Sequence, residues 1–172
     1  MSKLPLILAS CLTASILAVT LVAQRGTDFS GTWVLDETQI RPAPDIPQRL
    51  VVEQPLITTT NVRGEPMPPA YYTLYVTRHL GDVVQQDNHR IGLSGGTVGG
   101  PGSGGGSRYE VAWRGDSLWI YSESSGASGA NIRRRGELWR IDQLGRLVIS
   151  IETRDKDEAV ATRTLTYRRE KQ

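Results

Sequence analysis

Cysteine is almost absent from this sequence. Cys11 is the only one, and it lies in an apolar run at the N-terminus. The chain after that run therefore has no disulfide, no thiolate nucleophile and no cysteine-ligated metal. Residues Gln24 to Gln172 must be stabilised by an ordinary hydrophobic core, which a single domain of this size can build.

A strong excess of charge of one sign is also missing. Lysine and arginine together number 20 against 18 aspartates and glutamates, and the arginines are scattered along the chain. A nucleic-acid-binding domain normally gathers basic residues on one face or stripe. We therefore expect no nucleic-acid partner.

Helical periodicity is absent after Ala23. Apolar residues instead alternate with polar ones over short segments, which Gly, Pro, Asp and Asn separate. This pattern predicts antiparallel strands, and eight or nine of them at this spacing predict a closed barrel or a sandwich. After a first strand around Trp33, the expected strands are residues 50–62 with a bend at Pro55, 71–77, 79–86, 108–114, 117–123, 132–141, 146–153 and 161–169.

The segments between these strands include two tight turns and two longer stretches without a strand pattern. Gly115-Asp116 predicts a two-residue hairpin, and Asp142 to Gly145 predicts a type I turn. Residues 40–47 carry three prolines and predict an extended crossing without strand pairing. Residues 91–107 are dominated by glycine and lack an apolar period, so we expect a mobile loop there.

The first 23 residues have the features of a secretory signal peptide. Lys3 precedes a long apolar run that ends in Leu21-Val22-Ala23 before polar residues begin. An uncleaved membrane anchor is the alternative, because the run approaches the length of a spanning helix. Lipidation at Cys11 is disfavoured, because the residues after it stay apolar. We expect cleavage after a signal helix, no membrane insertion of the mature chain, and export to the periplasm or beyond the cell.

Four fragments of the chain carry a resemblance to a known family. They read FSGTWVLD from Phe29, WRGDSLWI from Trp113, ELWRIDQLGRLVI from Glu137 and TLTYRR from Thr164. Together they resemble the small exported bacterial lipocalin-like proteins of the calycin superfamily, over most of residues 28–169.

The resemblance implies an all-β fold, an eight- to nine-stranded antiparallel up-and-down β-barrel that occupies residues 28–170. It also implies that Trp33 plugs the closed end of the barrel beneath a basic side chain of the last strand. If Tyr167 points inward, Arg169 points inward as well, so Arg169 is the basic residue expected to cover Trp33 and Arg168 is the alternative. Gly31 is expected to let the chain pack closely at this point.

No catalytic, metal or cofactor site is expected. His79, Asp82, Asp87 and His89 fall within eleven residues, but their spacing matches no tetrahedral zinc pattern. No histidine-based catalytic triad can be recognised, and the acids of residues 155–158 surround Lys156 in an expected surface turn. The Arg-Gly-Asp-Ser run at 114–117 is explained by its hairpin, and Arg133 to Arg135 should point alternately to opposite faces.

The remaining question is what the barrel interior holds. An eight-stranded barrel either fills with side chains or holds one small ligand. The sequence predicts an exported, non-enzymatic barrel that binds a small apolar or amphipathic molecule. The alternatives are an envelope-associated structural or interaction protein with a solid core and, ranked last, a barrel hydrolase or isomerase. The expected inward, ligand-contacting residues are Tyr72, Leu74, Val76, Tyr109, Val111, Trp113, Leu118, Ile120 and Trp139.

Overall fold

A computed structural model of the protein describes residues 26–38, 40, 42–68, 71–93, 98–101, 108–125, 132–154 and 160–171. The expected signal peptide with Cys11, the acidic residues 155–158 and much of the glycine-rich segment lie outside these ranges. Within the described ranges, no helix is long and apolar enough to cross a membrane.

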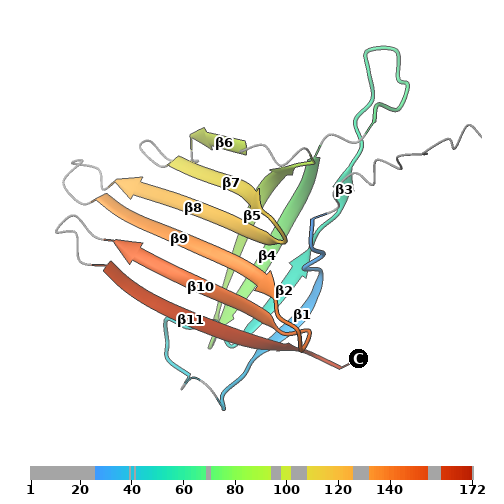
Figure 1. Ribbon diagram of the computed structural model, residues 1–172. Helices are drawn as coiled ribbons and strands as arrows, with labels where there is room; N and C mark the ends of the chain where they lie inside the picture. The colour runs from blue at the N-terminus through green and yellow to red at the C-terminus, as the bar shows by residue number, and fades with distance from the viewer. Residues whose placement is uncertain are drawn as a thin grey trace, which may run out of the picture.

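The described residues form one antiparallel sheet (Figure 1). Its strands are β1 (Gly31–Leu35), β2 (Arg49–Glu53), β3 (Leu56–Ile57), β4 (Tyr71–Leu80), β5 (Val83–Gly92), β6 (Val98–Pro101), β7 (Arg108–Arg114), β8 (Ser117–Ser125), β9 (Ile132–Ile141), β10 (Leu147–Arg154) and β11 (Val160–Arg169). The order across the sheet is β5, β4, β2, β1, β11, β10, β9, β8, β7 and β6, and β3 pairs with the start of β4 as a continuation of β2 beyond Pro55.

The fold class is the expected one: all-β, antiparallel and up-and-down. Most strands pair with their neighbours in sequence, and the pairing of β1 with β11 joins the two ends of the chain. The sheet curls so that β7 to β11 form one wall and β1, β2, β4 and β5 form the wall opposite (Figure 1).

Strands β5 and β7 approach each other where the barrel would close, and a ring contact bridges them. The two strands are in contact, and the rings of His89 and Tyr109 lie 6.4 Å apart between centroids. Among the described residues no backbone ladder joins β5 to β6 or β7. The expected fully closed barrel is therefore curled but not completely hydrogen-bonded. The four residues of β6, which include two glycines and Pro101, have little capacity to extend a ladder.

Three expected segment boundaries are wrong. The strand expected to run to Val62 ends at Ile57, and Thr60 beyond it forms an isolated bridge to Pro66. The strand predicted at 79–86 is interrupted at Gly81-Asp82, where a hairpin joins β4 to β5 and Gly81 has a φ of 59°. The loop predicted at 91–107 contains the end of β5 and all of β6. Backbone pairing requires no apolar period, so neighbouring strands order residues that the side-chain pattern assigned to a loop.

The tight turns lie where the sequence predicts them. Gly115 has a φ of 62° between β7 and β8, and Gly145 has a φ of 73° after Asp142. The Asp142 carboxylate accepts hydrogen bonds from the backbone N–H groups of Leu144 and Arg146, at 2.9 Å each. These turns fix the registers of β7 with β8 and of β9 with β10.

Alternate residues of the strands face one continuous apolar core. Burial of each large apolar side chain contributes roughly 1.5–3 kcal/mol. The buried members are Phe29, Trp33, Leu35, Ile46, Leu50, Val52, Leu74, Val76, Ile91, Val111, Leu118, Ile120, Trp139, Leu147, Ile149, Ile151, Leu165 and Tyr167.

Aromatic residues plug one end of this core. Trp33 is fully buried, and its Nε1–H donates to the Phe29 carbonyl at 2.9 Å. Phe29 stacks against Trp113 and meets Trp139 edge-on, at centroid distances of 6.1 and 5.9 Å. Phe29 is the only phenylalanine of the chain, and its place between two indoles was not foreseen from the sequence.

Arg169 covers the Trp33 ring from the last strand. Its Cζ lies 4.7 Å from the ring centroid, and the two residues are register partners of β11 and β1. This is the pair expected from the sequence. Gly31 has a φ of 138°, and a Cβ there would lie 3.5 Å from Arg169 Cζ, an ordinary contact. The backbone conformation, more than close packing, thus requires glycine here.

Candidate functional site

The inward face of the sheet changes from apolar to charged along the strands. On β9 the inward positions run from Trp139 through Glu137 to Arg135, and on β4 they run from Val76 to Arg78. The end of the barrel away from Trp33 is therefore lined by ionisable side chains, which the strict alternation of the strands places inside.

A cavity of about 330 Å³ lies at this charged end. Strands β4, β5, β8 and β9 and the crossing between β1 and β2 provide its walls. Its lining residues are Asp45, Pro47, Arg78, Leu80, Gln85, Asp87, His89, Ile120, Ser122, Arg135 and Glu137. The volume is at the lower end of the range typical of small-molecule sites.

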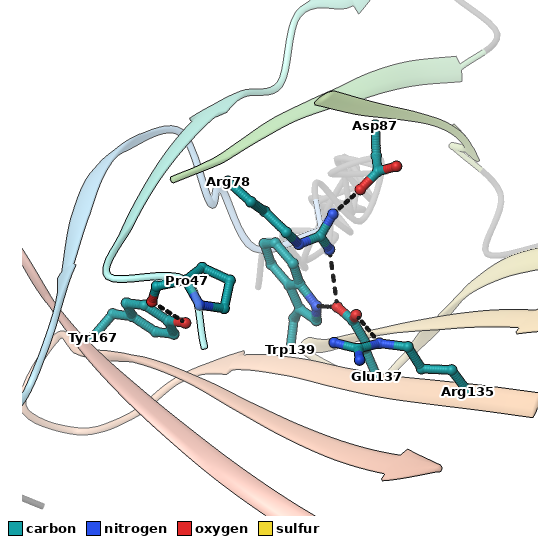
Figure 2. A network of polar contacts seen from close by, with 7 residues as sticks. All are labelled: Pro47, Arg78, Asp87, Arg135, Glu137, Trp139 and Tyr167. Atoms are coloured by element: carbon teal, nitrogen blue, oxygen red, sulfur yellow. Dashed lines mark hydrogen bonds and ion pairs between the residues drawn. The ribbon is translucent and has the colours of Figure 1, made fainter. Parts of the chain in front are cut away.

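Glu137 is the centre of the charged end (Figure 2). Its residue is only 6% exposed. Its carboxylate accepts hydrogen bonds from Arg135 Nε at 2.7 Å, Trp139 Nε1 at 2.8 Å and Arg78 Nη2 at 3.2 Å. Burial by itself would raise the pKa of Glu137, but the two guanidinium groups and these hydrogen bonds hold that pKa below its usual value. Glu137 is therefore an ionised carboxylate inside the barrel.

Arg78 links the two walls. Its guanidinium binds Glu137 on β9 and Asp87 on β5, and its side chain is 12% exposed (Figure 2). Strands β4 and β9 belong to opposite walls of the barrel, so the ion pair between Arg78 and Glu137 joins these walls across the interior. Removing Glu137 would leave the largely buried Arg78 with Asp87 as its one carboxylate partner, and breaking a buried ion pair in this way is strongly destabilising.

His89 lies beside this network on β5. Partial removal from water, followed by the nearby positive charge of Arg78, lowers the pKa of His89 to about 4, although Glu137 opposes the shift. The imidazole is thus neutral at neutral pH. It faces the cavity and also meets the Tyr109 ring across the seam.

The crossing between β1 and β2 is fastened over the charged end. The hydroxyl of Tyr167 donates to the Pro47 carbonyl at 3.0 Å, and Arg163 Nη1 binds Asp45 at 2.6 Å. Burial raises the pKa of the Tyr167 phenol, which remains protonated and able to donate. The proline-rich crossing therefore forms part of the cavity wall.

The cavity offers both donors and acceptors to a ligand. The Arg135 side chain is 43% exposed, and its terminal nitrogens donate to no described residue. Ser122, Gln85 and the half-exposed Asp87 supply further polar groups, and Ile120 and Leu80 supply apolar surface. In the part of the chain that the structure describes, no buried side-chain polar atom lacks a partner. The site is suited to a molecule with polar and apolar parts.

The residues expected to contact a ligand are divided by the structure. Ile120 lines the cavity. Five are fully or almost fully buried in the core, and three are partly buried and pack against it. The buried group is Leu74, Val76, Val111, Leu118 and Trp139, and the second group is Tyr72, Tyr109 and Trp113.

The charged cavity residues were missed by the sequence reasoning. The inward positions predicted to contact a ligand are all apolar or aromatic, whereas Arg78, Glu137 and Arg135 occupy the same inward register near the strand ends. A signal was present: extending the alternation of Ile141 and Trp139 along β9 places Glu137 and Arg135 on the inner face. Conversely, Arg134 points outward and pairs with Glu123, as alternation predicts for the arginine run.

The histidines and acids of residues 79–89 do not come together. His79 and His89 lie on different strands and opposite faces of the sheet, and Asp87 binds Arg78. Among the described residues, no group of three or more histidine, cysteine or acidic side chains is arranged to hold a metal ion.

Comparisons with known proteins give a distant structural likeness. No protein-family model matches the chain, and no curated protein matches it. The solved structure of the wild-type fluorescent protein UnaG is similar with a TM-score of 0.46 and 14% sequence identity, over 83% of this chain and 97% of that chain.

Proposed function

We propose that this chain is an exported barrel that binds a small amphipathic molecule in the cavity at its charged end. The observation that carries the proposal is the cavity of about 330 Å³, whose lining combines the partly exposed Arg135 with apolar Ile120 and Leu80. The signal-like N-terminus and the lipocalin-like fragments of the sequence support the same function.

The charges of the cavity argue against a wholly apolar ligand. Such a molecule would remove water from Arg135 and Asp87 without replacing its hydrogen bonds, at a cost of roughly 1–3 kcal/mol for each group. A ligand with a polar or anionic group beside a short apolar part avoids this cost. Its polar group would lie against Arg135 and Ser122, and its apolar part against Ile120.

A solid barrel that serves as a structural or interaction protein is the second candidate. It is favoured by the packing of Leu74, Val111, Leu118 and Trp139, which leaves the predicted apolar lumen filled. In that case the charged end would only stabilise the fold.

A dye-binding titration separates these two functions. The fluorescence of 1-anilinonaphthalene-8-sulfonate, an amphipathic anion, would be measured with the wild-type protein and with Ser122→Trp, which fills the cavity. Thr164→Trp, on the exposed outer face of β11, is the matched control. Saturable binding that Ser122→Trp abolishes and Thr164→Trp retains supports the cavity. Equal binding by all three proteins, or none, supports the solid barrel.

Export is tested independently of ligand binding. The full chain would be expressed in its source, and the N-terminus of the protein in the extracytoplasmic fraction would be sequenced. The proposal expects a mature N-terminus directly after Ala23. Recovery of the intact chain from the cytoplasmic fraction alone would refute export.

A further inference from the structure

A second concave site lies on the outer surface of the β8–β9–β10 wall. It is a groove of about 340 Å³, on the opposite face of the sheet from the cavity. Its lining residues are Trp119, Tyr121, Glu123, Arg134, Gly136, Glu152 and Arg154. The function proposed above does not use any of them.

Gly136 creates the floor of this groove. It lies directly across from Tyr121 on β8 and from Glu152 on β10. A Cβ at this position would lie 2.2 Å from Trp119 Cη2 and 2.7 Å from Cζ2, so any side chain would displace the indole. The indole of Trp119 thus occupies the space that a side chain of residue 136 would take.

The outer position of Trp119 distinguishes it from the other tryptophans. Trp33 and Trp139 are fully buried, and Trp113 packs against the core. Trp119 and Tyr121 instead give the groove an aromatic surface on the outside of the sheet. The guanidinium of Arg114, an exposed residue, lies 4.3 Å from the Trp119 ring centroid. An exposed cation of this kind contributes little and can be displaced by a ligand.

Polar groups of both kinds border the aromatic surface. Arg134 Nε binds Glu123 at 3.1 Å, and Arg154 Nη2 binds Glu152 at 3.0 Å. The Tyr121 hydroxyl donates to Glu123 at 2.9 Å. The four charged side chains are partly exposed, between 29% and 47%, so each carboxylate and guanidinium retains capacity for further hydrogen bonds.

We propose that this groove binds a saccharide, one pyranose ring of a neutral glycan. A sugar ring carries an apolar face of C–H groups and a rim of hydroxyls that both donate and accept. The first matches the aromatic surface of Trp119 and Tyr121, whose π faces carry partial negative charge. The second matches planar carboxylates and guanidiniums, which make the stronger, charge-assisted hydrogen bonds.

The balance of charge in the groove favours a neutral ligand. Its two glutamates are each paired with one of its two arginines, so an anion or a cation would have to compete with an existing ion pair. An apolar peptide side chain would leave the charged rim without partners, whereas hydroxyl groups satisfy both signs.

Affinity electrophoresis tests the proposal directly. The full chain would be run in native gels that contain dextran, xylan, laminarin or pullulan, and its migration would be compared with gels without polysaccharide. The proposal expects retardation by at least one of these neutral glycans. Unchanged migration in all four would overturn it.

Three variants assign any retardation to the groove. Trp119→Ala should weaken binding at least about tenfold, equivalent to about 1.4 kcal/mol, and Gly136→Ala should do so by displacing the indole. Glu152→Gln, at an exposed side chain, tests the rim without altering the packing. Tyr75→Ala is the matched control, since it removes an exposed aromatic of β4 on the opposite wall.

Two results would contradict the assignment to the groove. One is retardation that Tyr75→Ala reduces as much as Trp119→Ala does. The other is retardation that folded Glu152→Gln and Gly136→Ala proteins both retain in full.

Discussion

The two ends of the barrel interior solve the same packing problem in different ways. Around Trp33 the space is filled by Phe29, Trp113 and Trp139, and a single cation, Arg169, covers the plug from outside. At the other end the walls are held apart and joined by ion pairs around Glu137, and space remains between them. The difference teaches that an alternating strand fixes which residues point inward, but not whether the inside is filled.

Shape and solvation explain why the cavity lies at the charged end. Planar aromatic rings interlock and leave little space, because interiors pack as densely as organic crystals. Charged side chains need hydrogen-bond partners, and Glu137 and Arg78 obtain them from one another and from Arg135, Trp139 and Asp87. Groups that are not satisfied internally, such as the terminal nitrogens of Arg135, must reach water or a ligand, and this requirement keeps the cavity open.

Trp33→Ala should produce the largest loss of stability. It removes a fully buried indole and leaves a void at the plug, so the free energy of unfolding should fall by about 4 kcal/mol. Urea denaturation followed by far-UV circular dichroism measures this. Trp33→Phe should cost clearly less. A loss below about 1 kcal/mol for the alanine variant would show that the plug is not tightly packed.

Glu137→Leu should cost about 3 kcal/mol, because it leaves Arg78 with one carboxylate partner and Trp139 Nε1 without an acceptor. The double variant Arg78→Met with Glu137→Leu should recover part of the loss, because the buried charge disappears with its partner. The same denaturation experiment measures both. A double variant less stable by the sum of the two single losses would contradict the coupling.

His89 should make stability fall in mild acid. Its folded pKa of about 4 lies below the unfolded value of 6.5, so the unfolded chain binds the extra proton first. Above pH 6.5 protonation of His89 does not reduce the free energy of unfolding. As pH falls from 6.5 toward 4 the unfolded chain is stabilised by binding the proton, and the free energy of unfolding should fall by roughly 2 kcal/mol between pH 7 and 4.5. His89→Gln should flatten this part of the profile. Glu137 should add a further loss only at lower pH, because its pKa is lowered. If the dependence of stability on pH were unchanged in His89→Gln, the loss of stability in mild acid could not be assigned to His89.

Arg169→Met should destabilise the protein less than the three changes above, by about 0.5–1 kcal/mol, because the cation over Trp33 is exposed to water. Arg168→Met is the matched control. Its Nε lies 3.7 Å from Asp36, and its exposed side chain should contribute a few tenths of a kcal/mol at most. Thermal unfolding of the two variants compares them. A larger loss of stability in Arg168→Met would indicate that Arg168, and not Arg169, is the cation that stabilises Trp33.

The sequence predicted the plug more fully than the cavity. The resemblance to lipocalin-like proteins implied that Trp33 lies beneath a basic side chain of the last strand, and alternation with Tyr167 selected Arg169. The hairpins at Gly115 and Asp142 follow from turn chemistry. Such features depend on residues near each other in sequence or on one recognisable motif.

The cavity depends on residues brought together from distant strands. Arg78 and Glu137 are 59 residues apart, and each alone is typical of a solvent-exposed strand position. Only the curl of the sheet makes them partners. The pairing of β6 could not be predicted either, since glycines carry no side-chain pattern and β6 is ordered by pairing with the backbone of β7.

Native mass spectrometry of the protein purified from its source tests most directly whether the charged end is a binding cavity and not a second plug. The wild-type protein and Thr164→Trp should each retain a small molecule that gentle activation releases, and Ser122→Trp should be recovered without it. Three bare proteins, or a molecule that all three retain, would contradict the account.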